Sequence, residues 1–196
     1  MKVNEIFYSL QGEGRFTGTP AVFVRLSGCN LKCDFCDTEH LLHDEMSEED
    51  IVAAVAQYPC EHVVITGGEP TLQLTASLVC ELQNLGKFVQ IETNGTKEIG
   101  KDLYACIDWI TCSPKYQPLK IERIDELKVV YEVGKDMTEA EEIAEYYDNI
   151  QDLYLQPCDT HDESKNAANI KATVEYIKQN PIWKLSLQTQ KILNVR

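Results

Sequence analysis

Short apolar runs rich in β-branched residues recur along the chain, and each has the length of a buried strand. More polar segments, several of them containing glycine or proline, separate the runs. The runs lie at 21–26, 62–66, 88–92, 109–112, 126–130, 153–156 and 184–187. The pattern therefore predicts a buried sheet built from these segments.

Helical patterns lie between several of the predicted strands. Ser47 and the acidic residues after it predict a helix that reaches about residue 58, and Gly86 can end a helix over 76–85. Thr138 opens a Thr-Glu-Ala-Glu sequence of capping-box form, which predicts a helix to about residue 147. We expect a further helix over about 165–179. Strands that alternate with helices indicate right-handed crossovers and a largely parallel sheet.

The length of 196 residues limits this architecture. A complete eight-unit (β/α) barrel typically needs about 250 residues. We therefore expect an α/β fold of the open, partial (β/α) barrel type. The chain is 43% hydrophobic and has no Pro/Gly/Ser-rich linker, so we expect one domain over 1–196.

The charge balance narrows the classes of partner. A net charge of −14 and a pI near 4.7 repel phosphate backbones and anionic lipid, which disfavours nucleic-acid and membrane binding. No segment approaches the roughly 20 apolar residues of a membrane span, and the first residues lack an export signal. We expect a cytoplasmic protein with a small-molecule substrate.

Glycine and polar residues follow most of the predicted strands. In parallel α/β sheets the carboxyl ends of the strands hold ligands, so these segments are expected to form one site. They are a cysteine-containing loop, Gly67-Gly68-Glu69-Pro70, Thr93-Asn94-Gly95, Ser113-Pro114-Lys115, Gln156-Pro157 and Gln188-Thr189.

The loop after the first predicted strand carries Cys29, Cys33 and Cys36. Three soft thiolates on so short a loop suit one [4Fe-4S] cluster, and no fourth cysteine lies nearby. One iron would stay open to a small molecule that chelates through an amine and a carboxylate, and S-adenosylmethionine (SAM) has both groups.

A structural zinc site is the alternative interpretation of the loop. His40 or His43 could complete a zinc tetrahedron, and the chain would then be a zinc-bound interaction protein rather than an enzyme. Four of the remaining cysteines lie in apolar contexts and are interpreted as small core residues, namely Cys60, Cys80, Cys106 and Cys112.

The C-x₃-C-x₂-C loop and the Gly-Gly-Glu-Pro segment resemble the radical SAM superfamily, in which a reduced cluster cleaves SAM to a 5′-deoxyadenosyl radical. The resemblance implies that Phe35 lies against the adenine and that the backbone at Gly68 and Glu69 meets the methionyl amine. Polar groups at Glu92, Asn94, Ser113 and Lys115 suit the ribose or carboxylate, although ordinary strand-end turns also use such residues. The expected SAM-binding set is Phe35, Cys36, Asp37, Gly68, Glu69, Glu92, Asn94, Ser113, Pro114, Lys115, Gln156, Pro157, Cys158 and Asp159.

Further motifs resemble the 7-carboxy-7-deazaguanine synthase family, and the likeness runs essentially from end to end. They are Ser-Leu-Gln-Gly-Glu-Gly at 9–14, Cys-Asp-Thr at 36–38, Ile-Glu-Thr-Asn-Gly at 91–95, Asp-Glu-Leu-Lys-Val-Val at 125–130 and Leu-Gln-Thr-Gln-Lys at 187–191. The resemblance implies a radical ring contraction of 6-carboxy-5,6,7,8-tetrahydropterin to 7-carboxy-7-deazaguanine with release of ammonia, a step toward queuosine.

The chemistry of two residues fits such a substrate. Gln11 can satisfy an amide-like pterin edge, and Arg25 can pair with the carboxylate, unless Arg25 faces outward from its apolar strand. By resemblance the substrate contacts are Leu10, Gln11, Gly12, Arg25, Thr66 and Arg196. Resemblance also makes Thr38 a Mg²⁺ ligand. Two positions depart from the family pattern: Gln190, where histidine is common, and Arg196, where a small or apolar residue is usual.

The family resemblance further implies a homodimer and an external electron donor such as a flavodoxin or ferredoxin. The alternative enzyme is a radical SAM activase that places a glycyl radical on a partner protein. An activase would need an open groove for a peptide, whereas the 9–14 motif and Arg25 favour a compact acid-binding pocket.

Overall fold

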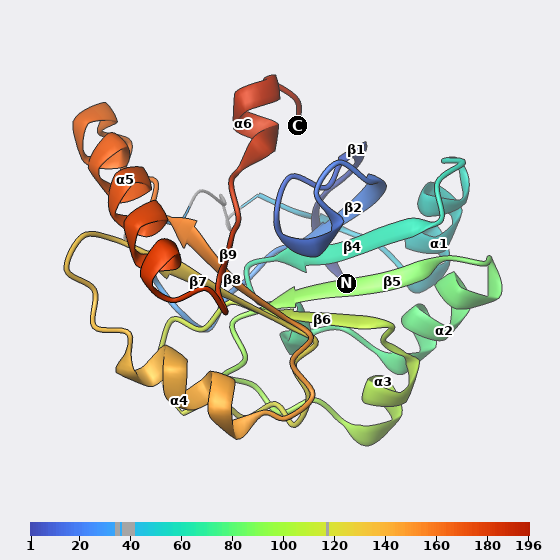
Figure 1. The fold of residues 1–196 in the computed structure, drawn as a ribbon. Helices are drawn as coiled ribbons and strands as arrows, with labels where there is room; N and C mark the ends of the chain where they lie inside the picture. Colours follow the sequence, from blue (N-terminus) through green and yellow to red (C-terminus); the bar gives the residue numbers. More distant parts are fainter. Residues whose placement is uncertain (34–35, 37–41, 117) are drawn as a thin grey trace.

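The computed structural model describes residues 1–33, 36, 42–116 and 118–196 (Figure 1). Within these residues one sheet runs in the order β3-β1-β2-β4-β5-β6-β7-β8-β9, so its two edges are not joined. The strands are β1 (Lys2–Leu10), β2 (Pro20–Leu26), β3 (Asp44–Glu45), β4 (His62–Gly67), β5 (Phe88–Thr93), β6 (Trp109–Cys112), β7 (Glu126–Tyr131), β8 (Asp152–Pro157) and β9 (Lys184–Leu185).

The pairing from β2 to β9 is parallel throughout, which confirms the predicted open α/β architecture. Two strands were not predicted. β1 pairs antiparallel with β2, and β3 pairs antiparallel with β1. β1 mixes polar Asn4 and Glu5 with apolar residues and is mostly half-buried, so it lacks the continuous apolar run of a central parallel strand. The last strand is also shorter than predicted, because it ends at Leu185.

The predicted helices are present as α1 (Glu48–Ala56), α2 (Ala76–Asn84), α4 (Thr138–Tyr146) and α5 (Glu163–Gln179). Ser47 caps α1 in a capping box, since its hydroxyl accepts from the Asp50 amide at 3.1 Å. The expected cap at Thr138 is wrong. Thr138 is the first helical residue, and its amide and hydroxyl both donate to Asp136. The short helices α3 (Lys101–Cys106) and α6 (Thr189–Leu193) and the 3₁₀ turns η1 (Gly14–Phe16) and η2 (Pro70–Leu72) were not predicted.

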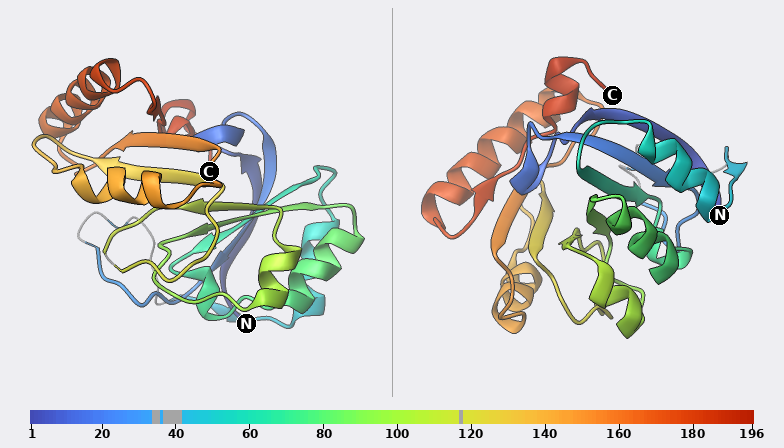
Figure 2. Two further views of the ribbon diagram at one scale, coloured as in Figure 1. Left: turned by 60° about the horizontal axis from the view of Figure 1, so that its bottom comes forward. Right: turned by 90° about the vertical axis from the view of Figure 1, so that its right-hand side faces the viewer.

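The main hydrophobic core lies between the sheet and the helices α1 to α5, which flank the outside of the curved sheet (Figure 2). Val24, Ile65 and Ile91 are fully buried on successive parallel strands. Because these strands are buried on both faces, their sequences are unbroken apolar runs. In the described part of the chain no helix is long and apolar enough to cross a membrane.

The four cysteines that the sequence predicts to be core residues differ in how deeply they are buried. Cys112 is buried in the core, but Cys60, Cys80 and Cys106 are only half-buried. Cys80 on α2 and Cys106 on α3 place their sulfur atoms 2.6 Å apart where the two helices meet. All eight cysteines have free thiols.

The end of the chain returns to the beginning of the sheet (Figure 1). The amide and hydroxyl of Thr189 both donate to the carbonyl of Gly12, and the hydroxyl of Ser9 donates to the carbonyl of Arg196. These contacts bring α6 over the segment that follows β1, and together the two segments form one wall of the site described next.

Candidate active site

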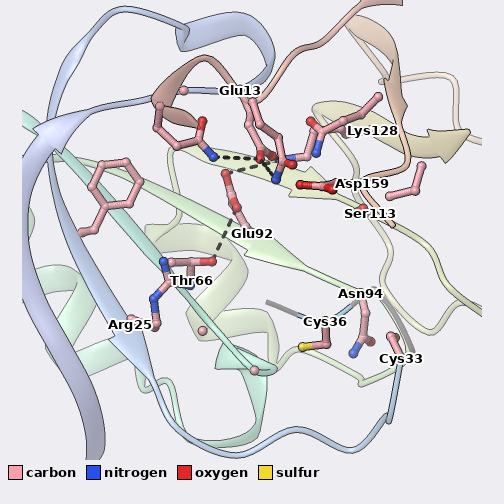
Figure 3. A pocket seen from close by; sticks show the side chains of 18 of the residues that line it. Glu13, Arg25, Cys33, Cys36, Thr66, Glu92, Asn94, Ser113, Lys128 and Asp159 are labelled. Atoms are coloured by element: carbon pink, nitrogen blue, oxygen red, sulfur yellow. Dashed lines mark hydrogen bonds and ion pairs between the residues drawn. The ribbon is translucent and has the colours of Figure 1, made fainter. Parts of the chain in front are cut away.

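A pocket lies at the carboxyl ends of the parallel strands, where the sequence predicted a site (Figure 3). Residues from the segment after β1, the cysteine loop, the ends of β4, β5 and β8, the segment after β6, and the C-terminal segment line it. Parallel strands end at one edge of the sheet, so segments far apart in sequence meet there.

Most of the expected site residues face this pocket. All six expected substrate contacts line it: Leu10, Gln11, Gly12, Arg25, Thr66 and Arg196. The expected SAM-binding residues that line it are Cys36, Gly68, Glu92, Asn94, Ser113, Lys115, Gln156, Pro157, Cys158 and Asp159. Glu69 and Pro114 do not line it. Phe35, Asp37 and Thr38 lie outside the described residues.

The side chain of Glu69 is fully buried and holds two turns together. It accepts from the hydroxyl of Thr93 at 2.7 Å and from the amide of Asn94 at 2.8 Å. The other contacts, from the amide and hydroxyl of Thr71, cap η2. Glu69 therefore acts on the pocket through the Thr93–Asn94 turn that it orients.

Glycine is required at two positions beside the cysteine loop. Gly67 has φ +135°, and a Cβ there would lie 2.0 Å from the carbonyl oxygen of Leu26. A Cβ on Gly68 would lie 2.1 Å from the carbonyl oxygen of Gly28 and 2.9 Å from the Cβ of Cys29. The Gly-Gly turn thus packs its backbone directly against the start of the cysteine loop.

The thiols of Cys29, Cys33 and Cys36 border the same pocket. In the described part of the chain, no three metal-ligating side chains gather closely enough to hold a single metal ion. A cubane cluster binds each thiolate through a different iron, so its ligands stand farther apart than those of one zinc ion. Three soft thiols facing a pocket that also contains a glycine-rich turn fit a [4Fe-4S] cluster with an open iron.

A buried ion cluster lies away from the thiols and was not predicted. Lys128 is 4% exposed, and its Nζ lies 2.5 Å from Oε2 of Glu13 and 3.6 Å from Oε1 of Glu92 (Figure 3). Burial alone would raise the pKa of Glu13, but the charge of Lys128 and hydrogen bonds from Lys128, Gln188 and Gln190 lower it to about 2. Burial alone would lower the pKa of Lys128, yet the charges of Glu13 and Glu92 raise it above its usual value.

Polar neighbours complete the surroundings of these two carboxylates. Gln11 donates to Oε1 of Glu92 at 3.1 Å, and the hydroxyl of Thr66 donates to Oε2 at 3.4 Å. Gln188 donates to Oε1 of Glu13 at 3.0 Å. Gln190 donates to the same oxygen at 3.4 Å, while its own buried Oε1 has no hydrogen-bond partner among the residues that the structure describes.

A positive group lies across Thr66 from this cluster (Figure 3). Arg25 pairs through Nε with Oε1 of Glu5 at 3.0 Å, and Arg196 pairs with Oε2 of Glu5 at 2.5 Å. Both guanidinium groups lie near the face of Phe7, with their Cζ atoms 6.0 and 5.2 Å from the ring centroid. The pocket therefore has a guanidinium end that suits an anion and a carboxylate end that suits N–H donors.

Lys115 is a half-buried cation on the other side of the pocket lining. It donates to the hydroxyl of Ser113 at 2.6 Å. Burial, aided by the charge of Lys128, lowers the pKa of Lys115 to about 8. The side chain stays largely protonated near neutral pH and presents a positive charge to the cysteine side of the site.

Sequence reasoning missed Glu13 and Lys128. Glu13 was visible only as part of the 9–14 motif. Lys128 is a cation in the middle of the apolar run 126–130, the same signal that singled out Arg25 in 21–26. A charged side chain inside an apolar strand needs a partner, and this rule could have identified Lys128 as well.

Comparisons with known proteins agree with this site. The family model described as the radical SAM superfamily matches residues 23–181. A 7-carboxy-7-deazaguanine synthase of Bacteroides thetaiotaomicron is 48% identical, with 100% of this chain and 98% of the relative covered. The synthase of Neisseria meningitidis is 37% identical over 97% of this chain and 92% of the relative. The crystal structure of QueE from Escherichia coli aligns with a TM-score of 0.78 at 30% identity, covering 95% of this chain and 92% of that one.

The open parallel sheet, the three thiols after β2 and the glycine turn after β4 define a radical SAM enzyme. Within that superfamily the chain belongs to the 7-carboxy-7-deazaguanine synthase family. This membership favours a ring-contracting lyase over both alternatives, the glycyl-radical activase and the zinc-bound interaction protein.

Proposed function

We propose that this protein converts 6-carboxy-5,6,7,8-tetrahydropterin to 7-carboxy-7-deazaguanine and ammonia, as a step toward queuosine and related 7-deazapurines. The two products together contain every atom of the substrate, so the reaction needs no net oxidant. The observation that carries the proposal is the polarity of the pocket, with arginines at one end, carboxylates at the other and the thiols alongside.

The pocket residues around the three thiols fit the expected cofactors. Cys29, Cys33 and Cys36 would hold the [4Fe-4S] cluster, and SAM would occupy the adjoining pocket lined by Gly68, Asn94, Ser113, Lys115 and residues 156–159. When bound, cluster and SAM supply a 5′-deoxyadenosyl radical that abstracts hydrogen from C6 of the substrate. The protein's own task is to orient the substrate and to exclude water.

The substrate is oriented by its two unlike ends. Arg25 and Arg196 receive the carboxylate, because paired guanidinium groups bind carboxylates through charge-assisted hydrogen bonds. The other end of a reduced pterin carries N–H and amino donors, which need acceptors. Glu13 and Glu92 supply them, and Gln11 offers an amide beside Glu92.

In this orientation Glu92 would bind the substrate rather than the ribose of SAM, the contact that the sequence predicts. The contacts of Glu92 are with Gln11, Thr66 and Lys128, and the first two belong to the expected substrate group. A carboxylate held among substrate-binding residues is placed to accept from the pterin.

Other parts of the proposal rest on family membership. Thr38 would be a ligand of a Mg²⁺ ion that orients the substrate. The enzyme would be a cytoplasmic homodimer with a single radical SAM core domain in each chain, and a flavodoxin or ferredoxin would supply its electrons.

The proposal is tested by an anaerobic reaction of the cluster-loaded protein with SAM, dithionite, Mg²⁺ and 6-carboxy-5,6,7,8-tetrahydropterin, followed by mass spectrometry. We expect 7-carboxy-7-deazaguanine to accumulate over many turnovers. Omission of Mg²⁺ should slow the reaction. Formation of 5′-deoxyadenosine with no deazaguanine would retain a radical SAM enzyme but reject this substrate.

A further inference from the structure

Lys128 is an unusual residue for its place in the fold. It lies within β7 between Leu127 and Val129, both buried, and only its amine reaches polar groups. An unpaired buried ammonium is strongly unfavourable. The partners of Lys128 come from the segment after β1 and from β5, which are 115 and 36 positions away in sequence. Such an arrangement is formed only in the folded pocket.

We infer that Lys128 is a positioning residue that fixes Glu13 and Glu92 as acceptors for the N–H donors of the substrate and keeps Glu13 ionised. The inference rests on the proposed function, because it needs a donor-rich ligand at this end of the pocket. It adds a role for a residue that does not itself contact the reacting atoms.

The charge count of the cluster supports this role. One ammonium lies beside two carboxylates, so the end of the pocket retains negative character for a ligand with N–H donors. Without the ammonium, two neighbouring half-buried carboxylates would compete for ionisation, and one would hold a proton near neutral pH. A protonated carboxyl would present a donor where the ligand also presents a donor.

The carboxylates also retain unused capacity. Each ionised carboxylate offers about four acceptor sites. Glu92 uses them for Lys128, Gln11 and Thr66, and Glu13 uses them for Lys128, Gln188 and Gln190. The existing bonds fix the orientation of both groups and still leave room for a further donor.

Lys128 is not a suitable proton donor for the reaction. Its carboxylate partners raise its pKa, so the ammonium holds its proton throughout the neutral range. Two other titratable groups act on it. Glu126 lies on the same strand, and burial raises its pKa to about 7, while Lys115 carries a like charge from the segment after β6.

The first test compares K128M with K128R and with the control K184M. Lys184 also pairs with a carboxylate, Asp152, but it lies outside the pocket and is exposed. We expect K128M to raise KM for the pterin by about ten-fold or more at pH 7, with a smaller change in kcat and little change in SAM affinity. K128R should recover part of the loss, and K184M should match the wild type.

The pH dependence of KM distinguishes a positioning role of Lys128 from general damage to the folded protein. In K128M the KM should fall as pH rises from 6 to 9, because the second carboxylate then ionises and regains its acceptor character. We expect the ratio of the K128M and wild-type KM values to be largest at pH 6. A ratio that is constant across this range, or a K128M enzyme within two-fold of K184M, would overturn the inference.

The second test needs no turnover, so it distinguishes this inference from failure of the proposed function. Holoenzyme with the oxidised cluster and ¹³C-labelled glutamate carboxyls is titrated by NMR, with E13Q and E92Q used to assign the two signals. Glu13 should stay ionised from pH 6 to 8 in the wild type, and one carboxyl should titrate in that range in K128M. If K128M does not fold, K128M/E13Q removes one buried charge and should refold. Identical titrations in wild type and K128M would refute the role of Lys128.

Discussion

Two three-membered ion networks lie on the neighbouring parallel strands β7 and β8, and they differ in charge and position. In the pocket, Lys128 lies beside two carboxylates, Glu13 and Glu92. At the start of β8 the buried carboxylate of Asp152 lies between two more exposed cations, Arg15 and Lys184. The first network is open to a ligand at the end of the pocket, while the second joins η1, β8 and β9 on the protein surface.

The comparison indicates what each network does. In parallel α/β folds, residues toward the carboxyl ends of the strands serve ligands, and those at the amino ends serve stability. Asp152 has a pKa that burial would raise, but hydrogen bonds and charges from Lys184 and Arg15 lower it. We therefore expect changes in the Lys128 network to affect substrate use and changes in the Asp152 network to affect folding.

The largest expected effect is that of E13Q on catalysis. The neutral amide removes one of the two acceptors and leaves Lys128 with Glu92 alone. We expect kcat/KM for the pterin to fall by about 100-fold, equivalent to about 2.7 kcal/mol. Steady-state kinetics measure this value, and titration with SAM should give an unchanged dissociation constant. A fall of less than three-fold would show that Glu13 is not a substrate acceptor.

D152N should lower the stability of the protein and leave catalysis nearly unchanged. Replacement of the buried carboxylate leaves two cations facing an amide, and we expect the free energy of unfolding to fall by about 1–3 kcal/mol. Denaturant unfolding provides the measurement. The kcat/KM should remain within two-fold of the wild type, and a larger change would remove the distinction between the two networks.

Glu126 lies between the networks and predicts a pH dependence of stability. Oε2 of Glu126 accepts from the amide of Arg15, and burial raises the pKa of Glu126 to about 7. A carboxyl whose folded pKa is raised stabilises the protein most below its unfolded pKa of about 4.5, and this contribution is lost as pH rises through about 7. We expect a loss of about 2 kcal/mol between pH 5 and 8. E126Q should flatten this part of the curve, and an unchanged curve would contradict the assignment.

The smallest expected effect is that of K184M. Lys184 is 58% exposed, and Arg15 still pairs with Asp152 after its removal. We expect a change of less than about 1 kcal/mol in the free energy of unfolding. A thermal scan at low and at high salt should show the small difference only at low salt. A larger loss would mean that the Asp152 network depends on this exposed lysine.

The regular part of the fold was predictable because parallel strands buried on both faces are continuous apolar runs. β2, β4, β5 and β6 lie close to their predicted bounds for this reason. β1 was missed because an antiparallel strand with mixed burial has no such run. α3 and α6 are too short to show a helical period.

The site was predictable as far as it lies at strand ends. Gly68, Asn94 and Ser113 follow strands, and the topology brings strand ends together. A charged residue inside the apolar run 126–130 marks Lys128 as unusual, but its partner Glu13 is 115 positions away, so no local pattern could show their contact. Glu69 lies at a strand end but is turned inward, because side-chain direction in a tight turn depends on packing.

The most direct test of the central claim is the fate of the C6 hydrogen. Cluster-loaded protein is incubated anaerobically with SAM, reductant, Mg²⁺ and 6-carboxy-5,6,7,8-tetrahydropterin deuterated at C6, and both products are analysed by mass spectrometry. The account predicts deuterium in 5′-deoxyadenosine together with 7-carboxy-7-deazaguanine, and a much lower yield of both from R25M. Unlabelled 5′-deoxyadenosine without the deazaguanine would contradict it.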